Sequence, residues 1–265
     1  MGKKFYKNEK FQAVFFPVLY FLLTISIVVT GCYIFYKKYY QPIVVEGSSM
    51  QPTLVGGGSC HTSGYSYRYN YGMADLHNNA INSLKRFDVV VTYYPNSWIG
   101  PDNTYKIKRV WGFPGETLNL TYSSESKSFE FKVTHSRDGG TQIYKSDPIT
   151  SVEKNYEIER FVDNKPQIKT ETASFTVAKF SIPSKSFYVR AEKIRQINDY
   201  TLGKNEYFVM GDNWVSSTDS YEKMSNPDKL TRSYIQGRVL YISAYVSLVK
   251  GDPAYFHKFK ERYYF

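Results

Sequence analysis

The stretch RFDVVVTYY (86–94), followed by TYKIKRVWGFPGETLNL (104–120), decides the fold class of this chain. Both stretches are rich in Val, Ile, Thr and aromatic residues, which fit the pleated surface of a sheet. A loop containing Pro, Asn and Gly separates them, and the turn Phe113-Pro114-Gly115 interrupts the second. The sequence therefore predicts that they form core strands of one sheet.

The remainder of residues 39–265 also favours strands. Residues 118–200 alternate polar and apolar residues between turn signals, which predicts β-hairpins of a second sheet or of an inserted β subdomain. Residues 55–84 are rich in Gly, Ser, Tyr and Asn, and we expect loop rather than strand there, with at most one helical turn near its end. YFVMGD (207–212) and GRVLYISAYVSLV (237–249) return to apolar strands. The sequence predicts a mostly β fold.

A membrane segment precedes this β region. Residues 11–36 (FQAVFFPVLYFLLTISIVVTGCYIFY) carry no charge, and about 20 apolar residues suffice to cross a bilayer as a helix. The lysines are concentrated before this segment, so we expect residues 1–10 in the cytoplasm and 39–265 outside it. The lysines on its two sides are Lys3, Lys4, Lys7 and Lys10 before it, and Lys37 and Lys38 after it.

Two alternatives for the same segment concern processing. A cleavable signal peptide has an apolar core of about 7 to 15 residues, whereas this run is longer and continues into Lys37 and Lys38, so an uncleaved single-pass anchor is favoured. Val29-Thr30-Gly31-Cys32 resembles a bacterial lipoprotein cleavage box. Because the apolar run continues beyond Cys32, we expect an unmodified thiol there, with lipidation left open.

Composition excludes several classes of function. The two cysteines, Cys32 and Cys60, provide neither a disulfide framework nor a metal site, and the four histidines show no HExxH pattern. No phosphate-binding glycine motif is present, so we expect neither a metal nor a small-molecule cofactor. The net charge of +10 is spread over the chain, which favours a solvated surface and anionic lipid over nucleic acid.

EGSSMQPTL (46–54), just after the anchor, raises the question of serine chemistry without histidine. A serine can be activated by a neutral lysine, which requires a lysine pKa well below the usual 10.4. In the strand YKIKRV, Lys106 and Lys108 share one face, a pattern also typical of a solvated surface. Spacing alone does not distinguish Lys108 from Lys106, or Ser49 from Ser48.

Four separated motifs together resemble a known family. SMQPTL (49–54), RFDVVV (86–91), KRVWGFPGE (108–116), and GDNWVSSTDS (211–220) followed by GRV (237–239) are similar to the successive conserved boxes of bacterial type I signal peptidases. They occur in the family's order, after an N-terminal anchor, and span most of the extracytoplasmic chain. The resemblance implies an antiparallel β scaffold and a Ser-Lys dyad.

The resemblance also implies roles for individual residues. Ser49 corresponds to the nucleophile and Lys108 to the general base that takes its proton. Ser217 corresponds to the serine that hydrogen-bonds and orients the lysine, and Asp219 to an aspartate that supports the site. The remaining members of these boxes that we expect to support the site are Met50, Arg109 and Asp212.

The chain departs from the family's pattern at three positions. Gly47 stands where some members have a serine that completes the oxyanion hole, as in Gram-positive relatives. The Ser49 amide is then the expected oxyanion donor, and the second donor stays open. Trp214 and Tyr221 stand where the family usually has arginines. We therefore expect no salt bridge from Asp219 to residue 221.

The implied function is a membrane-anchored endopeptidase that removes signal peptides from exported pre-proteins, cutting after small residues in an A-x-A-like pattern. Its partners would be secretory pre-proteins and the lipid bilayer. A soluble repressor-type Ser-Lys self-cleaving peptidase is an alternative, which the anchor and the absence of a DNA-binding motif argue against. A non-catalytic, anchored β-rich binding protein is another, and the departures at Trp214 and Tyr221 favour it.

Overall fold

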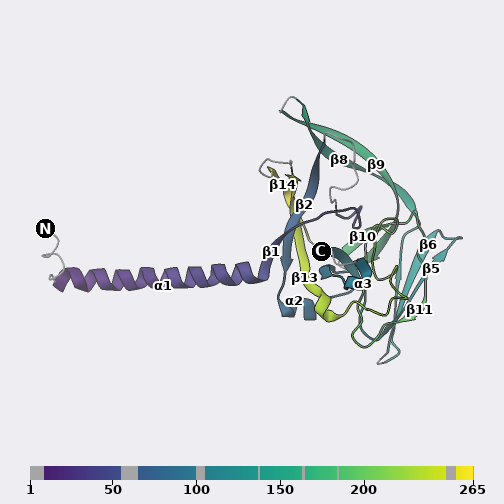
Figure 1. The fold of residues 1–265 in the computed structure, drawn as a ribbon, viewed down its shortest axis with the longest axis horizontal. Helices are drawn as coiled ribbons and strands as arrows, with labels where there is room; N and C mark the ends of the chain where they lie inside the picture. Colours follow the sequence, from purple (N-terminus) through teal and green to yellow (C-terminus); the bar gives the residue numbers. More distant parts are fainter. Residues whose placement is uncertain are drawn as a thin grey trace. The chain divides into compact units, whose positions relative to one another are not determined.

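The structure, a computed structural model, consists of two units, Met1–Gln41 and Pro42–Phe265 (Figure 1). It describes residues 9–54, 65–99, 105–136, 138–162, 165–183, 185–248 and 255–264.

The first unit contains one long helix, α1 (Glu9–Tyr39, 31 residues). Over Gln12–Tyr39, α1 is the one helix in the described part of the chain that is long and apolar enough to cross a membrane. Lys37 and Lys38 lie in its last turn, where cations interact favourably with the helix dipole. The expected N-terminal apolar helix is confirmed, while its orientation stays a prediction.

The elements that follow α1 are mostly strands. In chain order they are β1 (Tyr40–Val44), β2 (Tyr65–Asp75), α2 (Asn78–Asn82), β3 (Val89–Tyr93), α3 (Asn96–Ile99), β4 (Tyr105–Gly112), β5 (Glu116–Ser123), β6 (Ser128–His135), β7 (Thr141–Lys145), β8 (Thr150–Val162), β9 (Lys165–Ile182), β10 (Lys185–Arg190), β11 (Ile197–Thr201), β12 (Phe208–Met210), the 3-10 helix η2 (Arg232–Tyr234), β13 (Ile235–Leu248) and β14 (Tyr255–Tyr264).

These strands form two antiparallel sheets. A ten-stranded sheet has the order β10-β9-β8-β2-β13-β3-β4-β12, with β1 paired to β2 and β14 to β13. A four-stranded sheet has the order β11-β5-β6-β7. The named ladders, including β3 with β4 and β8 with β9, are antiparallel. The mostly antiparallel β fold is thus confirmed.

The prediction that residues 86–94 and 104–120 lie in one sheet is correct for β3 and β4, which pair with Val90 opposite Lys108. It is wrong for the residues after the turn, because β5 belongs to the four-stranded sheet. Gly115 has a φ of +79°, a conformation that side chains disfavour. This turn carries the chain from one sheet to the other.

Two further predictions concern residues 55–84 and 118–200. The loop expected over residues 55–84 is contradicted by β2, which pairs along β13 over most of its length, so long-range pairing prevails over its turn-like composition. Residues 55–64 lie outside the described residues, and α2 accounts for the expected helical turn. The strands of residues 118–200 are divided between both sheets, and the boundaries of an inserted subdomain stay a prediction.

The largest core cluster joins the two sheets through aromatic side chains. Trp111 of β4 lies edge-on to Phe131 of β6, with ring centroids 5.0 Å apart, and also to Phe180 of β9 at 5.5 Å. Such pairs stabilise a core beyond the area they bury, by about 0.5–1.5 kcal/mol each. Trp214, from the segment 211–220, is fully buried in the same cluster. That segment is therefore anchored in the core.

Candidate active site

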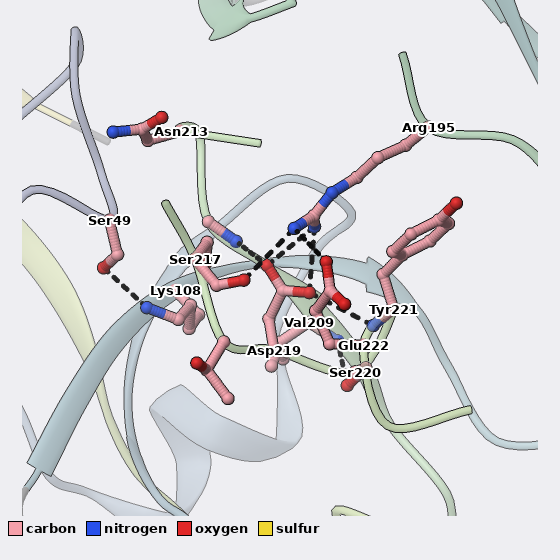
Figure 2. A network of polar contacts seen from close by, with 12 residues as sticks. Ser49, Lys108, Arg195, Val209, Asn213, Ser217, Asp219, Ser220, Tyr221 and Glu222 are labelled. Carbon is pink, nitrogen blue, oxygen red and sulfur yellow. Dashed lines mark hydrogen bonds and ion pairs between the residues drawn. The ribbon is translucent and has the colours of Figure 1, made fainter. Parts of the chain in front are cut away.

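Lys108 lies in the middle of β4, which is flanked by β3 and β12. Its side chain is 2% exposed, and Nζ donates a hydrogen bond to Ser49 Oγ at 2.6 Å (Figure 2). Lys106, two residues earlier on the strand, is only partly buried. The geometry thus makes the distinction that spacing did not make, because Lys108 alone of the two contacts a serine hydroxyl in the described structure.

The Ser49 segment is held by its neighbours on both sides. Met50 is 1% exposed and packs in a cluster that includes Val89 of β3, which anchors the chain directly after Ser49. Gly47 has a φ of +83°, where a residue with a side chain would be strained. The Asn213 main-chain N–H donates to the Ser49 carbonyl at 2.9 Å. Ser49 itself stays partly exposed and accessible to a substrate.

Ser48 has different partners. Its Oγ donates to Ser216 Oγ at 3.4 Å, and its carbonyl accepts a hydrogen bond from Asn213 Nδ2 at 3.0 Å. Ser49 therefore carries the hydroxyl that faces the lysine, while Ser48 ties the segment 46–54 to the segment 211–220. Asn213 binds the backbone of both serines, a positioning role that the sequence did not reveal.

The environment lowers the pKa of Lys108 from 10.5 to about 8. Burial is the main cause, since an ammonium group is poorly solvated there. Asp219 acts in the opposite direction, and Lys106 lowers the pKa again through charge repulsion. At pH 7 about one amine in ten would then be neutral, rather than about one in a few thousand for an exposed lysine. Such an amine can accept a proton from a hydroxyl.

A buried ion pair fixes β4 against the segment 211–220. Arg109 Nε donates to Asp212 Oδ1 at 2.8 Å, and its Nη1 donates to the Phe87 carbonyl at the same distance. The guanidinium also lies 4.2 Å from the centroid of the Phe187 ring. Because Arg109 and Lys108 are adjacent in β4, this pair also fixes the strand position from which Lys108 projects.

Ser217 does not make the contact that the resemblance implies. Its side chain is 8% exposed, and Oγ has no hydrogen-bond partner among the described residues, Lys108 included. A buried hydroxyl without a partner is costly, and such groups in native proteins are often found at functional sites. Ser217 lies beside the dyad but does not orient the lysine in this structure.

Asp219 is fully buried and well supplied with donors. Its Oδ2 accepts the Gly211 N–H at 3.0 Å, and its Oδ1 accepts the Tyr221 N–H at 3.1 Å. Arg195 Nη1 lies 2.9 Å from both oxygens. Asp219 is therefore paired with an arginine that lies outside every motif, while Tyr221 contributes only its main-chain N–H.

The sequence contains no indication of Arg195, or of how Tyr221 and Trp214 pack in place of the two family arginines. Arg195 lies between β10 and β11, in a stretch with no pattern that indicates burial. Tyr221 presents its ring to the Arg195 guanidinium, 4.7 Å from the centroid. Trp214 is a core residue whose ring lies 5.0 Å from that of Phe129. Tyr221 and Trp214 therefore both make packing contacts, Tyr221 with Arg195 and Trp214 with the aromatic core.

Gly211 is required by close approach. A Cβ added at residue 211 would collide with the Ser49 carbonyl oxygen and with Ser217 Oγ. If Ser49 is the nucleophile, we expect Gly211→Ala to lower kcat/KM by about 10²-fold, because a displacement of about 1 Å at a reacting group is that costly. Gly203→Ala is the matched control, since its Cβ would meet Glu206 only at ordinary contact distance. Wild-type kinetics in a folded Gly211→Ala variant would contradict the described contact.

Comparison with known proteins identifies the family. Residues 18–242 match the family model described as "Signal peptidase, peptidase S26". The chain belongs to this family. Similar curated proteins are named Signal peptidase I. One from Buchnera aphidicola subsp. Baizongia pistaciae is 24% identical over 95% of this chain and 82% of its own length. One from Pseudomonas aeruginosa is 25% identical over 78% of this chain and 60% of its own length.

A third relative, from Buchnera aphidicola subsp. Schizaphis graminum, is 24% identical over 68% of this chain and 62% of its own length. The chain thus spans about three fifths of the length of two of these relatives and most of the first. The family and these names support a signal-peptide-removing serine endopeptidase. A non-catalytic binding protein on the same scaffold is not favoured.

Proposed function

We propose that this signal peptidase family member cleaves secretory pre-proteins with a Ser49/Lys108 dyad. The observation that carries the proposal is the 2.6 Å hydrogen bond from the Lys108 amine to the Ser49 hydroxyl, made by a lysine that is 2% exposed. A serine within hydrogen-bond reach of a base whose pKa is lowered by burial is the arrangement that nucleophilic catalysis requires.

The reaction proceeds in two halves. Ser49 Oγ attacks the scissile carbonyl carbon while Lys108 Nζ takes the hydroxyl proton, and the carbonyl oxygen becomes an oxyanion. Collapse of this intermediate breaks the C–N bond, and Lys108 returns the proton to the leaving amine. Water then attacks the ester at Ser49, giving its proton to Lys108, and Ser49 leaves with that proton. The Ser49 main-chain N–H is the proposed donor to the oxyanion.

The supporting residues act on the position and charge of the dyad. Met50 anchors the nucleophile segment in the core, and the Arg109–Asp212 pair fixes β4. Asp219 holds the Gly211 turn against which the Ser49 carbonyl lies. We propose that Ser217, whose hydroxyl has no hydrogen-bond partner among the described residues, accepts a hydrogen bond from the Lys108 ammonium during turnover.

Helix α1 supports a membrane location for this reaction. A substrate whose signal peptide is itself inserted in the bilayer meets a tethered enzyme at high effective concentration. More lysines precede the apolar run than follow it, which supports an N-terminus in the cytoplasm and a dyad outside it. We propose cleavage after small residues in an A-x-A-like pattern.

Full-length protein in detergent, incubated with a pre-protein that has small residues at its cleavage site, tests this function. We expect one cut at that site, located by the mass of the mature product. A matched pre-protein with a bulky residue immediately before the cut should remain intact. Binding of the first pre-protein without any cut would support the binding alternative and contradict the proposal.

The pH dependence of this cleavage follows from the lysine. Because Lys108 must be neutral to accept the serine proton, kcat/KM should increase tenfold per pH unit below pH 8 and level off above it. The midpoint is the Lys108 pKa of about 8, lowered mainly by burial. Initial rates between pH 6 and 9.5 measure it, with circular dichroism to show that the protein stays folded. A rate that falls through this range as pH rises would contradict a lysine base.

A further inference from the structure

Arg195 is a buried cation that none of the family motifs contains. Its guanidinium is fully buried, and Nη1 donates to both oxygens of Asp219 at 2.9 Å. Nη2 donates to the Ser217 carbonyl at 3.1 Å and to Glu222 Oε1 at 3.3 Å. Figure 2 shows Arg195 and Asp219 in the network beside the Ser49–Lys108 pair. One side chain thus reaches several points of the segment 211–222.

The contacts of Arg195 with Asp219 are linked to Ser49 through main-chain hydrogen bonds. Asp219, held by Arg195, accepts the Gly211 N–H at 3.0 Å. Gly211 packs directly against the Ser49 carbonyl, and two residues later Asn213 donates to that carbonyl at 2.9 Å. A change in the Asp219 carboxylate would therefore be transmitted to the position of Ser49.

The same carboxylate acts on the charge of Lys108. The charged groups that face Lys108 are Lys106 on its own strand, Asp212 in the turn, Asp219 and Arg195, and Asp212 is already paired with Arg109. The Tyr94 hydroxyl, which donates to the Thr218 carbonyl, also lies in this region, and burial and Asp219 raise its pKa, so it stays neutral. A buried carboxylate without a cation would favour the protonated lysine. Arg195 supplies that cation.

We propose that Arg195 is a positioning residue of the Ser49/Lys108 site, neutralising Asp219 beside the lysine and holding the segment 211–222 in place. This inference rests on the proposed function. The position at which the family resemblance places an arginine holds Tyr221, and the Tyr221 ring packs against the guanidinium that enters from residue 195. A fork-shaped guanidinium suits this role because it pairs with a carboxylate through directed hydrogen bonds.

The test compares Arg195→Met with Arg195→Lys in full-length protein in detergent. Loss of the cation leaves Asp219 charged beside Lys108, so Arg195→Met should raise the midpoint of the pH–rate profile by about one unit and lower kcat about tenfold. Arg195→Lys should shift the midpoint less, because it keeps the charge. Arg190→Met is the matched control, since Arg190 adjoins the segment 211–222 through its backbone while its side chain pairs with Glu192, so the midpoint should stay unchanged.

A second readout separates this inference from the proposed function. The Lys108 amine can be titrated by NMR with ¹³C-labelled lysine, assigned through Lys108→Met, whether or not the protein cleaves a pre-protein. We expect its pKa to rise by about one unit in Arg195→Met. An unchanged amine pKa together with an unchanged rate midpoint overturns the role of Arg195. Failure of the wild type to cleave, with the amine shift present, contradicts only the proposed function.

In Arg195→Met the buried Asp219 carboxylate has no cation, so among these variants it is the one for which misfolding must be controlled. The double variant Arg195→Met/Asp219→Asn removes both charges. We expect it to fold and its Lys108 pKa to return to about the wild-type value or below. A double variant that is as unfolded as the single one would show that Arg195 acts in packing alone, which also overturns the proposal.

Discussion

Replacing Lys108 with methionine is expected to lower kcat about 10³-fold, within the range of about 10²–10⁴-fold that a positioned general base typically contributes. Methionine has a similar length and is apolar, so it fits the site in which Lys108 is 2% exposed. No other amine in the described structure lies within hydrogen-bond reach of Ser49 Oγ. The rate of pre-protein cleavage in detergent measures the loss.

The same substitution should leave the fold as stable as before, or more stable. A lysine with its folded pKa lowered from 10.5 to about 8 destabilises the folded state by about 3 kcal/mol below pH 8, and the penalty fades as pH rises toward 10.5. Methionine carries no such penalty at neutral pH, although it loses one hydrogen bond. A large drop in melting temperature at pH 7 would contradict the assignment of the inactivity to lost chemistry.

Lys106→Met is the control for this prediction. Lys106 shares a face of β4 with Lys108 but is only partly buried. It lowers the Lys108 pKa by charge repulsion, so its loss should raise the midpoint of the pH–rate profile slightly and leave the maximal rate nearly unchanged. Inactivity in Lys106→Met with full activity in Lys108→Met would reverse the two roles.

Ser49→Ala is expected to abolish cleavage, again by at least about 10³-fold, because it removes the attacking oxygen. The matched control is Ser48→Ala. The Ser48 hydroxyl makes only a long hydrogen bond to Ser216 Oγ at 3.4 Å, so its loss should change kcat/KM less than about tenfold. Comparison of the two variants by initial rates separates adjacent serines that spacing alone left equivalent and that the motif resemblance assigned to different roles.

Much of the fold could be predicted because it depends on local patterns. The composition of the uncharged run within α1 predicts a membrane helix, and the β-branched runs of β3 and β4 predict strands. Strand β2 could not be predicted in the same way. Its tyrosines, asparagine and glycine indicate loop, and it forms a strand because β13 offers a long partner edge. Long-range pairing of this kind leaves no local signal.

The residues of the candidate site also fall into those that the sequence predicted and those that it did not. Motif order predicted the site residues Ser49, Lys108, Asp212 and Asp219, and the structure brings them into one region. The choice of Lys108 over Lys106 came from the motif resemblance and not from spacing, because both lie on the same face of the strand. The burial of Lys108 agrees with that choice. Arg195 could not be predicted from the sequence, since a single arginine among scattered charges gives no indication that it is paired and buried.

The central claim is that Ser49 and Lys108 act as one catalytic unit, and the double variant Ser49→Ala/Lys108→Met tests it most directly. Residues that act together lose nearly all of their effect with the first substitution. The account predicts that the double variant cleaves the pre-protein no more slowly than either single variant. Losses that multiply, or wild-type cleavage by either folded single variant, would contradict it.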